Sequence, residues 1–452
     1  MSSTFEAGAP TGGPQAKPAT LKRSLGLFDL VAFGLVYMAV VAPLTTLGFI
    51  WEASGGLMAA SYLAAALCMY FTARSYATMS EVDGSCGSVY SYTRTGLGDL
   101  AGFMAGWMIL LDYVLTPALV FALMSVGMST LVPSVDRATW IVLVLVVTLG
   151  LNWVGTQVAA KVSVASVIAQ IVMVFGVLAL AVVALDRGLG TGHLSAQPFV
   201  GTTGWPDLHL VLGGAALAVM TFLGFDAVST LSEEVRSEDK RLVGRATMWV
   251  LALASGLYVL TAWVIGNLMP AIQVQDPAAA IFELLGQTVG PWAPLLFGWL
   301  LAMVVGFTNA LPMLAGVSRV LFAMARNGQL PAPLGRIHAG TGVPRTALLV
   351  SSGVSLVVAL LLRDRVDLLA SLVSFGALAG FSFLHLSVLA HFARRGGPRR
   401  WFAHVIAPGI GLVLVVGLFI GMHREALWLG AAWFLAGLVY GLWLRQRPRP
   451  RR

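Results

Sequence analysis

Charged residues are scarce in this chain of 452 residues, of which 11% are Asp, Glu, Lys or Arg and 58% are hydrophobic. Because a soluble globular domain is about a quarter charged, this composition excludes an ordinary water-soluble protein. Cysteine is also rare: Cys68 in an apolar run and Cys86 in a polar segment are too few for a disulfide framework. The formal net charge is +8, but the basic residues are scattered between apolar runs, so no nucleic-acid-binding face is expected.

Catalytic and metal-binding patterns are missing as well. The histidines show no HExxH spacing, and His385 and His391 are too far apart along a helix to share a face. The stretch Gly96-Leu97-Gly98 follows no strand pattern, which excludes a dinucleotide fold. No nucleophile and base can be paired by spacing. We therefore expect no enzymatic activity, no cofactor and no metal ion.

Long hydrophobic runs are what the chain has instead. Its 50 glycines and 13 tryptophans suit a helical membrane bundle, where small residues let helices approach and aromatic residues lie at the interfaces. The runs predict an all-α membrane protein with twelve transmembrane helices, the first of which is retained rather than cleaved as a signal peptide. The expected spans are 27–51, 56–78, 100–131, 138–156, 162–185, 209–232, 243–269, 291–324, 346–362, 367–392, 403–421 and 427–444.

The distribution of basic residues predicts the orientation of these spans. Alternate segments hold 23 of the 28 Lys and Arg residues, and such residues are retained on the cytoplasmic side. Both termini are therefore expected in the cytoplasm of a multi-pass protein of the cell (inner) membrane. Residues 1–24 are expected to form a disordered tail, and residues 445–452 a basic tail near anionic lipid.

Two of the expected spans look interrupted. In the first, the run from Met38 to Pro43 ends in a proline that cannot continue a helix, about halfway across the bilayer. In the sixth, the run from Phe222 to Asp226 places Gly224 and a carboxylate where the span should be most apolar. Because the two breaks lie five spans apart, they indicate an inverted repeat with paired broken helices. A simple proline kink and a glycine packing contact are the alternative.

Acidic residues occur deep inside the spans at only two positions, Asp112 and Asp226. An ionised carboxylate in lipid is costly, so each is expected to face a polar cavity or a partner. For Asp226 an alternative is that its side chain caps a helix that restarts at Ala227. Two further acids, Glu233 and Glu234, lie at the cytoplasmic end of the sixth span. We expect them either to form an inner gate or to pair with neighbouring arginines.

Aromatic residues near these positions could complete a site for a cation, because a ring face attracts an ammonium group. The candidates are Tyr37, Tyr113, Phe222 and Phe225, although most aromatic residues in a span only pack. Tyr113 follows Asp112 directly and points about 100° away from it on the helix, so both line one cavity only if it is wide.

Several motifs resemble those of the amino acid, polyamine and organocation transporter superfamily. Residues 221–234 (TFLGFDAVSTLSEE) are similar to its sixth-helix signature, and Ser318-Arg319 with residues 324–331 (MARNGQLP) resemble its eighth-helix ending. Three more stretches look like the putrescine importer branch: Gly106-Trp107, residues 110–113 (LLDY) and residues 34–37 (GLVY).

The resemblance implies a five-plus-five inverted-repeat core with discontinuous helices 1 and 6. The core would cover residues 25–392, with helices 1–5 at about 27–185, helices 6–10 at about 209–392, and two more helices in residues 393–444. It also implies alternating access and a central substrate site between helices 1, 3, 6, 8 and 10. The implied substrate-binding residues are Tyr37, Met38, Ala39, Val40, Asp112, Tyr113, Phe222, Gly224, Phe225 and Asp226.

Departures from the family pattern bear on the substrate. Amino-acid carriers of the superfamily usually have a break rich in Gly and Ser in helix 1, whereas residues 38–43 (MAVVAP) are bulkier and would receive a carboxylate poorly. Gln170 stands where some relatives have a lysine, which leaves the coupling mechanism open. We therefore expect a secondary transporter that imports a small organic cation such as putrescine or another polyamine, with proton symport through either aspartate as a further hypothesis. An amino acid carrier of the same superfamily is the alternative.

Overall fold

A computed structural model describes most of the chain. The described residues are 25–83, 88–154, 157–202, 204–236, 239, 241–306, 308–338, 343–394 and 400–446. The tail predicted for residues 1–24, Cys86 and the last six residues of the basic tail lie outside this part, so those predictions stay untested.

Helices occupy every position at which a span is expected. The first two spans comprise α1 (Leu27–Met38), α2 (Ala42–Thr45), α3 (Leu47–Ser54) and α4 (Met58–Ser80). The next are α6 (Asp99–Leu131), α7 (Arg137–Val154), α8 (Gln157–Asp186), α10 (Leu208–Phe222) with the 3₁₀ helix η1 (Phe225–Glu234), and α11 (Arg241–Leu268). The last are α13 (Trp292–Leu301) and α14 (Ala310–Arg326), joined through the π-helical turn η4 (Ala302–Gly306), then α15 (Arg345–Leu361), α16 (Val366–Arg394), η6 (Phe402–Ile406) with α17 (Ala407–Ile420), and α18 (Arg424–Gln446).

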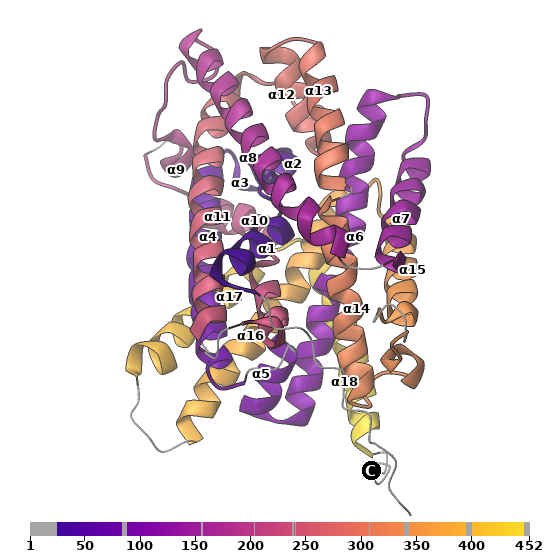
Figure 1. Cartoon of the computed structure of the whole chain (residues 1–452). Helices are drawn as coiled ribbons and strands as arrows, with labels where there is room; N and C mark the ends of the chain where they lie inside the picture. Colours follow the sequence, from indigo (N-terminus) through magenta and orange to yellow (C-terminus); the bar gives the residue numbers. More distant parts are fainter. Residues whose placement is uncertain are drawn as a thin grey trace, which may run out of the picture.

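Short helices connect the long ones at both ends of the molecule (Figure 1). They include α5 (Ser88–Leu97), α9 (Gln197–Val200) and α12 (Ala280–Thr288). Within the described residues the structure contains no strand, only an isolated bridge between Leu25 and Val235. The fold is therefore all-helical, as expected.

The long helices are apolar enough to cross a membrane. In the part of the chain that the structure describes, eight helical segments meet the requirement by length and composition, and α3 with α4 forms a ninth candidate bent by 99°. The helices α7, α13 and α15 are apolar but shorter. Large apolar side chains such as Val413, which is 70% exposed, would be unusual on a soluble protein and suit contact with lipid. These observations support a multi-pass membrane protein, and its twelve crossings stay a prediction.

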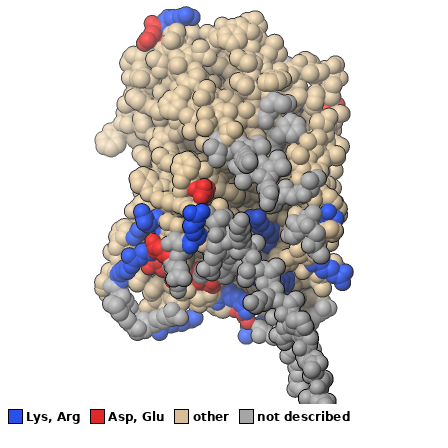
Figure 2. Space-filling view, in the orientation of Figure 1, with Lys and Arg blue, Asp and Glu red and all other residues tan. Residues whose placement is uncertain are grey.

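The charged residues gather toward one end of the molecule. Figure 2 shows a broad uncharged surface above a band of Lys, Arg, Asp and Glu in the lower part of the view. The described C-terminus lies at this same end in Figure 1. Which side of the membrane this end faces stays a prediction.

Small residues bring α6 and α16 into close contact. A Cβ at Gly376 would lie 2.7 Å from the backbone nitrogen of Asp112 and 2.9 Å from the carbonyl oxygen of Met108. One turn further, a Cβ at Gly380 would lie 3.1 Å from Ile109. The Gly376/Gly380 pair therefore acts as a packing motif, and it holds the backbone of α16 against the turn of α6 that carries Asp112.

This contact predicts that Gly376→Ala destabilises the protein by about 1–3 kcal/mol, because the added methyl group overlaps backbone atoms that cannot move independently. Thermal unfolding in detergent measures the effect. Gly353→Ala is the matched control. Gly353 lies within α15, and a Cβ added there would meet no neighbouring atom within 4 Å. The unfolding midpoint of this variant should therefore stay the same or rise. Equal midpoints for the two variants would contradict the packing account.

Candidate functional site

The first span breaks after Met38. Ala39 adopts a left-handed backbone conformation with φ of 58°, and the chain resumes as α2 at Ala42. Pro43 lies in the first turn of α2, where its missing N–H removes no helical hydrogen bond. The proline therefore marks the start of the second segment, and the break falls within residues 38–43 as the sequence predicts.

The sixth span breaks at Leu223 and Gly224. Leu223 is extended, Gly224 has φ of 108°, and the chain continues as η1 from Phe225. The continuation is a 3₁₀ helix of 10 residues, and it begins at Phe225 rather than at Ala227. Such a long 3₁₀ segment is uncommon and typical of strained or functional regions.

The two breaks contact each other. A Cβ at Gly224 would overlap Cδ1 of Tyr37 and would lie 3.1 Å from the backbone nitrogen of Met38. Gly224 is therefore required both by its positive φ and by the close approach of the first break. The glycine packing contact of the alternative is therefore present together with a break in the helix, and the inverted repeat stays a prediction.

Side chains from other helices satisfy the backbone groups that the first break frees. The hydroxyl of Tyr258 on α11 donates to the carbonyl oxygens of Ala39 at 3.1 Å and of Met38 at 3.3 Å. The N–H of Val41 donates to Oε1 of Gln170 on α8 at 3.3 Å. This is the condition under which broken helices are tolerated at membrane depth.

Gln170 also connects the break to the eighth span. Its Nε2 donates to Oγ of Ser166 and to Oδ1 of Asn309, each at 3.0 Å. All of these contacts are buried. Gln170 is uncharged and thus stabilises the break of the first span through hydrogen bonds alone.

Asp226 lies at the second break and is 1% exposed. Its Oδ2 accepts hydrogen bonds from the hydroxyl of Tyr113 at 2.8 Å and from that of Tyr76 at 3.2 Å, and its Oδ1 accepts from the N–H of Gly224 at 3.3 Å. Gly224 is the N-cap residue of η1, and Asp226 lies in the first turn. Asp226 is therefore not the N-cap residue itself, but its Oδ1 accepts a backbone N–H at the start of this helix.

Asp112 lies on α6 and is 3% exposed. Its Oδ1 accepts a hydrogen bond from the hydroxyl of Thr116, one turn along the same helix, at 2.9 Å. Asp112 and Tyr113 thus have different partners, since Tyr113 bonds to Asp226. Among the described residues neither Asp112 nor Asp226 forms an ion pair.

Aromatic rings surround the second break in two groups. Phe225 has its ring centre 5.8 Å from that of Tyr76 and 5.8 Å from that of Phe381. Phe222 lies on the other side, with its ring centre 5.1 Å from that of Tyr258. The candidates Phe222 and Phe225 therefore belong to separate clusters, and only the Phe225 group includes a ring that bonds to Asp226.

The remaining candidates lie at the break of the first span. Tyr37, Met38, Ala39 and Val40 are all buried. The hydroxyl oxygen of Tyr37 would lie 3.1 Å from a Cβ at Gly316, which places this ring between α14 and the second break.

The side chains of Glu233 and Glu234, the expected gate, lie outside the described part of the structure. Within that part, no group of three or more His, Cys, Asp and Glu side chains could hold a metal ion.

Sequence reasoning missed Tyr76 and Tyr258. Both lie on helices outside the expected set of 1, 3, 6, 8 and 10, on the second and seventh spans. A tyrosine in an apolar run gives no sequence signal of a partner more than a hundred residues away.

Family comparison agrees with this geometry. The model of the amino acid permease family matches residues 25–442, so the chain belongs to this family of membrane transporters and is not an enzyme.

Among its relatives, the low-affinity putrescine importer PlaP of Escherichia coli (strain K12) is 27% identical over 440 residues, 94% of each chain. The branched-chain amino acid permease BcaP of Bacillus subtilis (strain 168) is 28% identical over 465 residues, 95% of each chain. The methylthioribose transporter of the same Bacillus strain is 27% identical over 409 residues, 83% of this chain and 82% of the relative.

The contacts of Asp226 predict that Tyr113→Phe lowers the free energy of unfolding by about 1–3 kcal/mol, because a buried carboxylate loses its shortest hydrogen bond. Tyr70→Phe is the control, since Tyr70 is 37% exposed. Unfolding by heat in detergent compares the two. If both variants unfold at the wild-type temperature, the Tyr113 hydroxyl does not stabilise the carboxylate.

Proposed function

We propose that the protein imports a small organic cation, such as putrescine or another polyamine, through a site at the two helix breaks. The observation that carries the proposal is the environment of Asp226. Its buried carboxylate has hydroxyl and N–H donors but no cationic partner among the described residues. A bound ammonium group would supply the missing positive charge.

The second buried acid fits a substrate with more than one charge. Asp112 has a hydroxyl donor, Thr116, and likewise lacks an ion pair among the described residues. A diamine carries two ammonium groups, so two carboxylates could receive one molecule. Asp112 is also the candidate proton carrier of a symport step, because its carboxylate makes fewer hydrogen bonds than that of Asp226.

Aromatic rings beside Asp226 suit the same class of ligand. Tyr76, Phe225 and Phe381 form a buried cluster in which Tyr76 also bonds to the carboxylate. A desolvated ammonium on a ring face gains about 2 kcal/mol. The methylene chain of a diamine would pack against the same rings.

An amino acid is the second candidate, favoured by the similarity to the branched-chain amino acid permease BcaP. Binding an α-carboxylate at the first break needs free backbone N–H groups. Those of Ala39, Val41 and Ala42 already donate, to the oxygens of Val36, Gln170 and Ala39 respectively. This arrangement favours the amine.

The transport cycle in this proposal is alternating access in a five-plus-five inverted repeat. It is supported by two helix breaks that meet, one in the first and one in the sixth of the spans. With the basic end in the cytoplasm of the cell, the membrane potential drives cations inward. A doubly charged amine gains roughly 5 kcal/mol at 100 mV.

The proposal predicts that Asp226→Asn reduces putrescine uptake into proteoliposomes about 100-fold or more, because a buried charge pair is broken. Asp207→Asn is the matched control: Asp207 caps α10 by accepting a hydrogen bond from His209 N–H, and Asn caps equally well. This control should transport at the wild-type rate.

Competition separates the two candidate substrates. Unlabelled diamines should displace labelled putrescine, and neutral amino acids should not. Displacement by neutral amino acids but not by diamines, or full putrescine uptake by Asp226→Asn, would disprove the amine proposal.

A further inference from the structure

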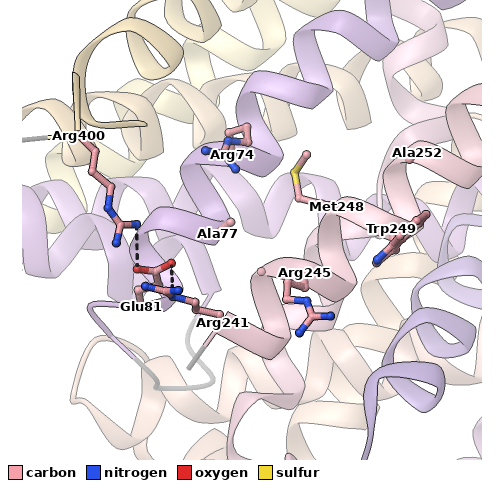
Figure 3. Close-up of a pocket in the computed structure, with 10 residues that line it drawn as sticks. Arg74, Ala77, Glu81, Arg241, Arg245, Met248, Trp249, Ala252 and Arg400 are labelled. Carbon is pink, nitrogen blue, oxygen red and sulfur yellow. Dashed lines mark ion pairs between the residues drawn. The ribbon is translucent and has the colours of Figure 1, made fainter. Parts of the chain in front are cut away.

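A pocket of about 470 Å³ lies between the end of α4 and the beginning of α11 (Figure 3). Its lining includes four arginines and one acid: Arg74, Arg241, Arg245, Arg400 and Glu81. These side chains give the lining a net charge of +3. The pocket is therefore suited to an anion, opposite in sign to the ligand of the transport site.

Glu81 cannot neutralise this pocket. Figure 3 shows its carboxylate between Arg241 and Arg400, with N–O distances of 3.6 Å and 3.8 Å. Both distances exceed those of direct hydrogen bonds, so the pairs are loose. Two guanidinium groups remain, because Arg74 and Arg245 form no ion pair with the described residues.

Arg74 has an aromatic contact, with its guanidinium carbon 5.9 Å from the centre of the Phe402 ring. Its Nε is buried and has no hydrogen-bond partner among the described residues. A buried donor without an acceptor is costly, and an anionic oxygen would satisfy it. The planar guanidinium group binds phosphate oxygens in particular, since it can donate two parallel hydrogen bonds.

The other wall of the pocket is apolar. Met248, Trp249 and Ala252 line it, and Trp249 is 54% exposed. Tryptophan is enriched where a membrane meets water. Arg74 precedes the end of α4 at Ser80 by six residues, about 9 Å along the helix axis. The pocket thus combines basic groups near the end of α4 with apolar side chains of α11, one of which, Trp249, is exposed.

We propose that this pocket binds the phosphate of an anionic phospholipid, with Arg74 and Arg245 as its main ligands. The glycerol and the first part of an acyl chain lie against Met248, Trp249 and Ala252. A soluble phosphate compound would use the arginines but would gain nothing from the apolar wall. The site is independent of the substrate that the protein transports.

The test measures phospholipid binding to the full-length protein in a neutral detergent by native mass spectrometry. Phosphatidylglycerol should bind more tightly than phosphatidylcholine. The double variant Arg74→Gln with Arg245→Gln should weaken the binding of phosphatidylglycerol about 30-fold, because each arginine contributes about 1 kcal/mol. The binding of phosphatidylcholine should not change. Arg187→Gln with Arg424→Gln, at the opposite end of the molecule, should leave both lipids unchanged.

A second variant covers the case in which the arginine variant does not fold. Ala252→Trp keeps every charge and fills the apolar side of the pocket, so it too should weaken the binding of phosphatidylglycerol. Unchanged binding in the variants that fold, or equal loss in the Arg187 and Arg424 control, would overturn the proposal. Competition by inorganic phosphate at the same concentration as the lipid would also overturn it, because the site would then bind a free anion.

Discussion

Every backbone polar group that leaves a helix at membrane depth must find a partner within the protein, because lipid offers none. This constraint explains how the two breaks are built. Tyr258 and Gln170 satisfy groups at the first break, and the carboxylate of Asp226 accepts the N–H of Gly224 at the second. The breaks persist because side chains of α8, α11 and η1 form hydrogen bonds with their backbone groups.

The same constraint gives the acid at the second break a structural role. Asp226 serves the backbone through one oxygen, and its other oxygen accepts from Tyr113 and Tyr76. Hydroxyl donors stabilise a carboxylate but add no positive charge. The carboxylate of Asp226 thus has its hydrogen bonds but no positively charged partner. A transporter of cations requires such a site, because the ligand that supplies the positive charge must also be able to leave.

Sequence predicts the local part of this arrangement and not the long-range part. Pro43 and Gly224 reveal the breaks because each acts on its own backbone. The roles of Tyr76 and Tyr258 cannot be predicted from the sequence, because they depend on how α4 and α11 pack against the breaks. Helical periodicity points Asp112 and Tyr113 in different directions, but it cannot show that Tyr113 reaches the carboxylate of Asp226 on another span.

The central claim is that Asp226 is the counter-charge of a bound amine. An experimental structure of the protein with putrescine tests it most directly. The account predicts an ammonium nitrogen about 3 Å from a carboxylate oxygen of Asp226, between the two breaks. An amine bound elsewhere, with Asp226 still held only by Tyr113, Tyr76 and Gly224, would contradict it.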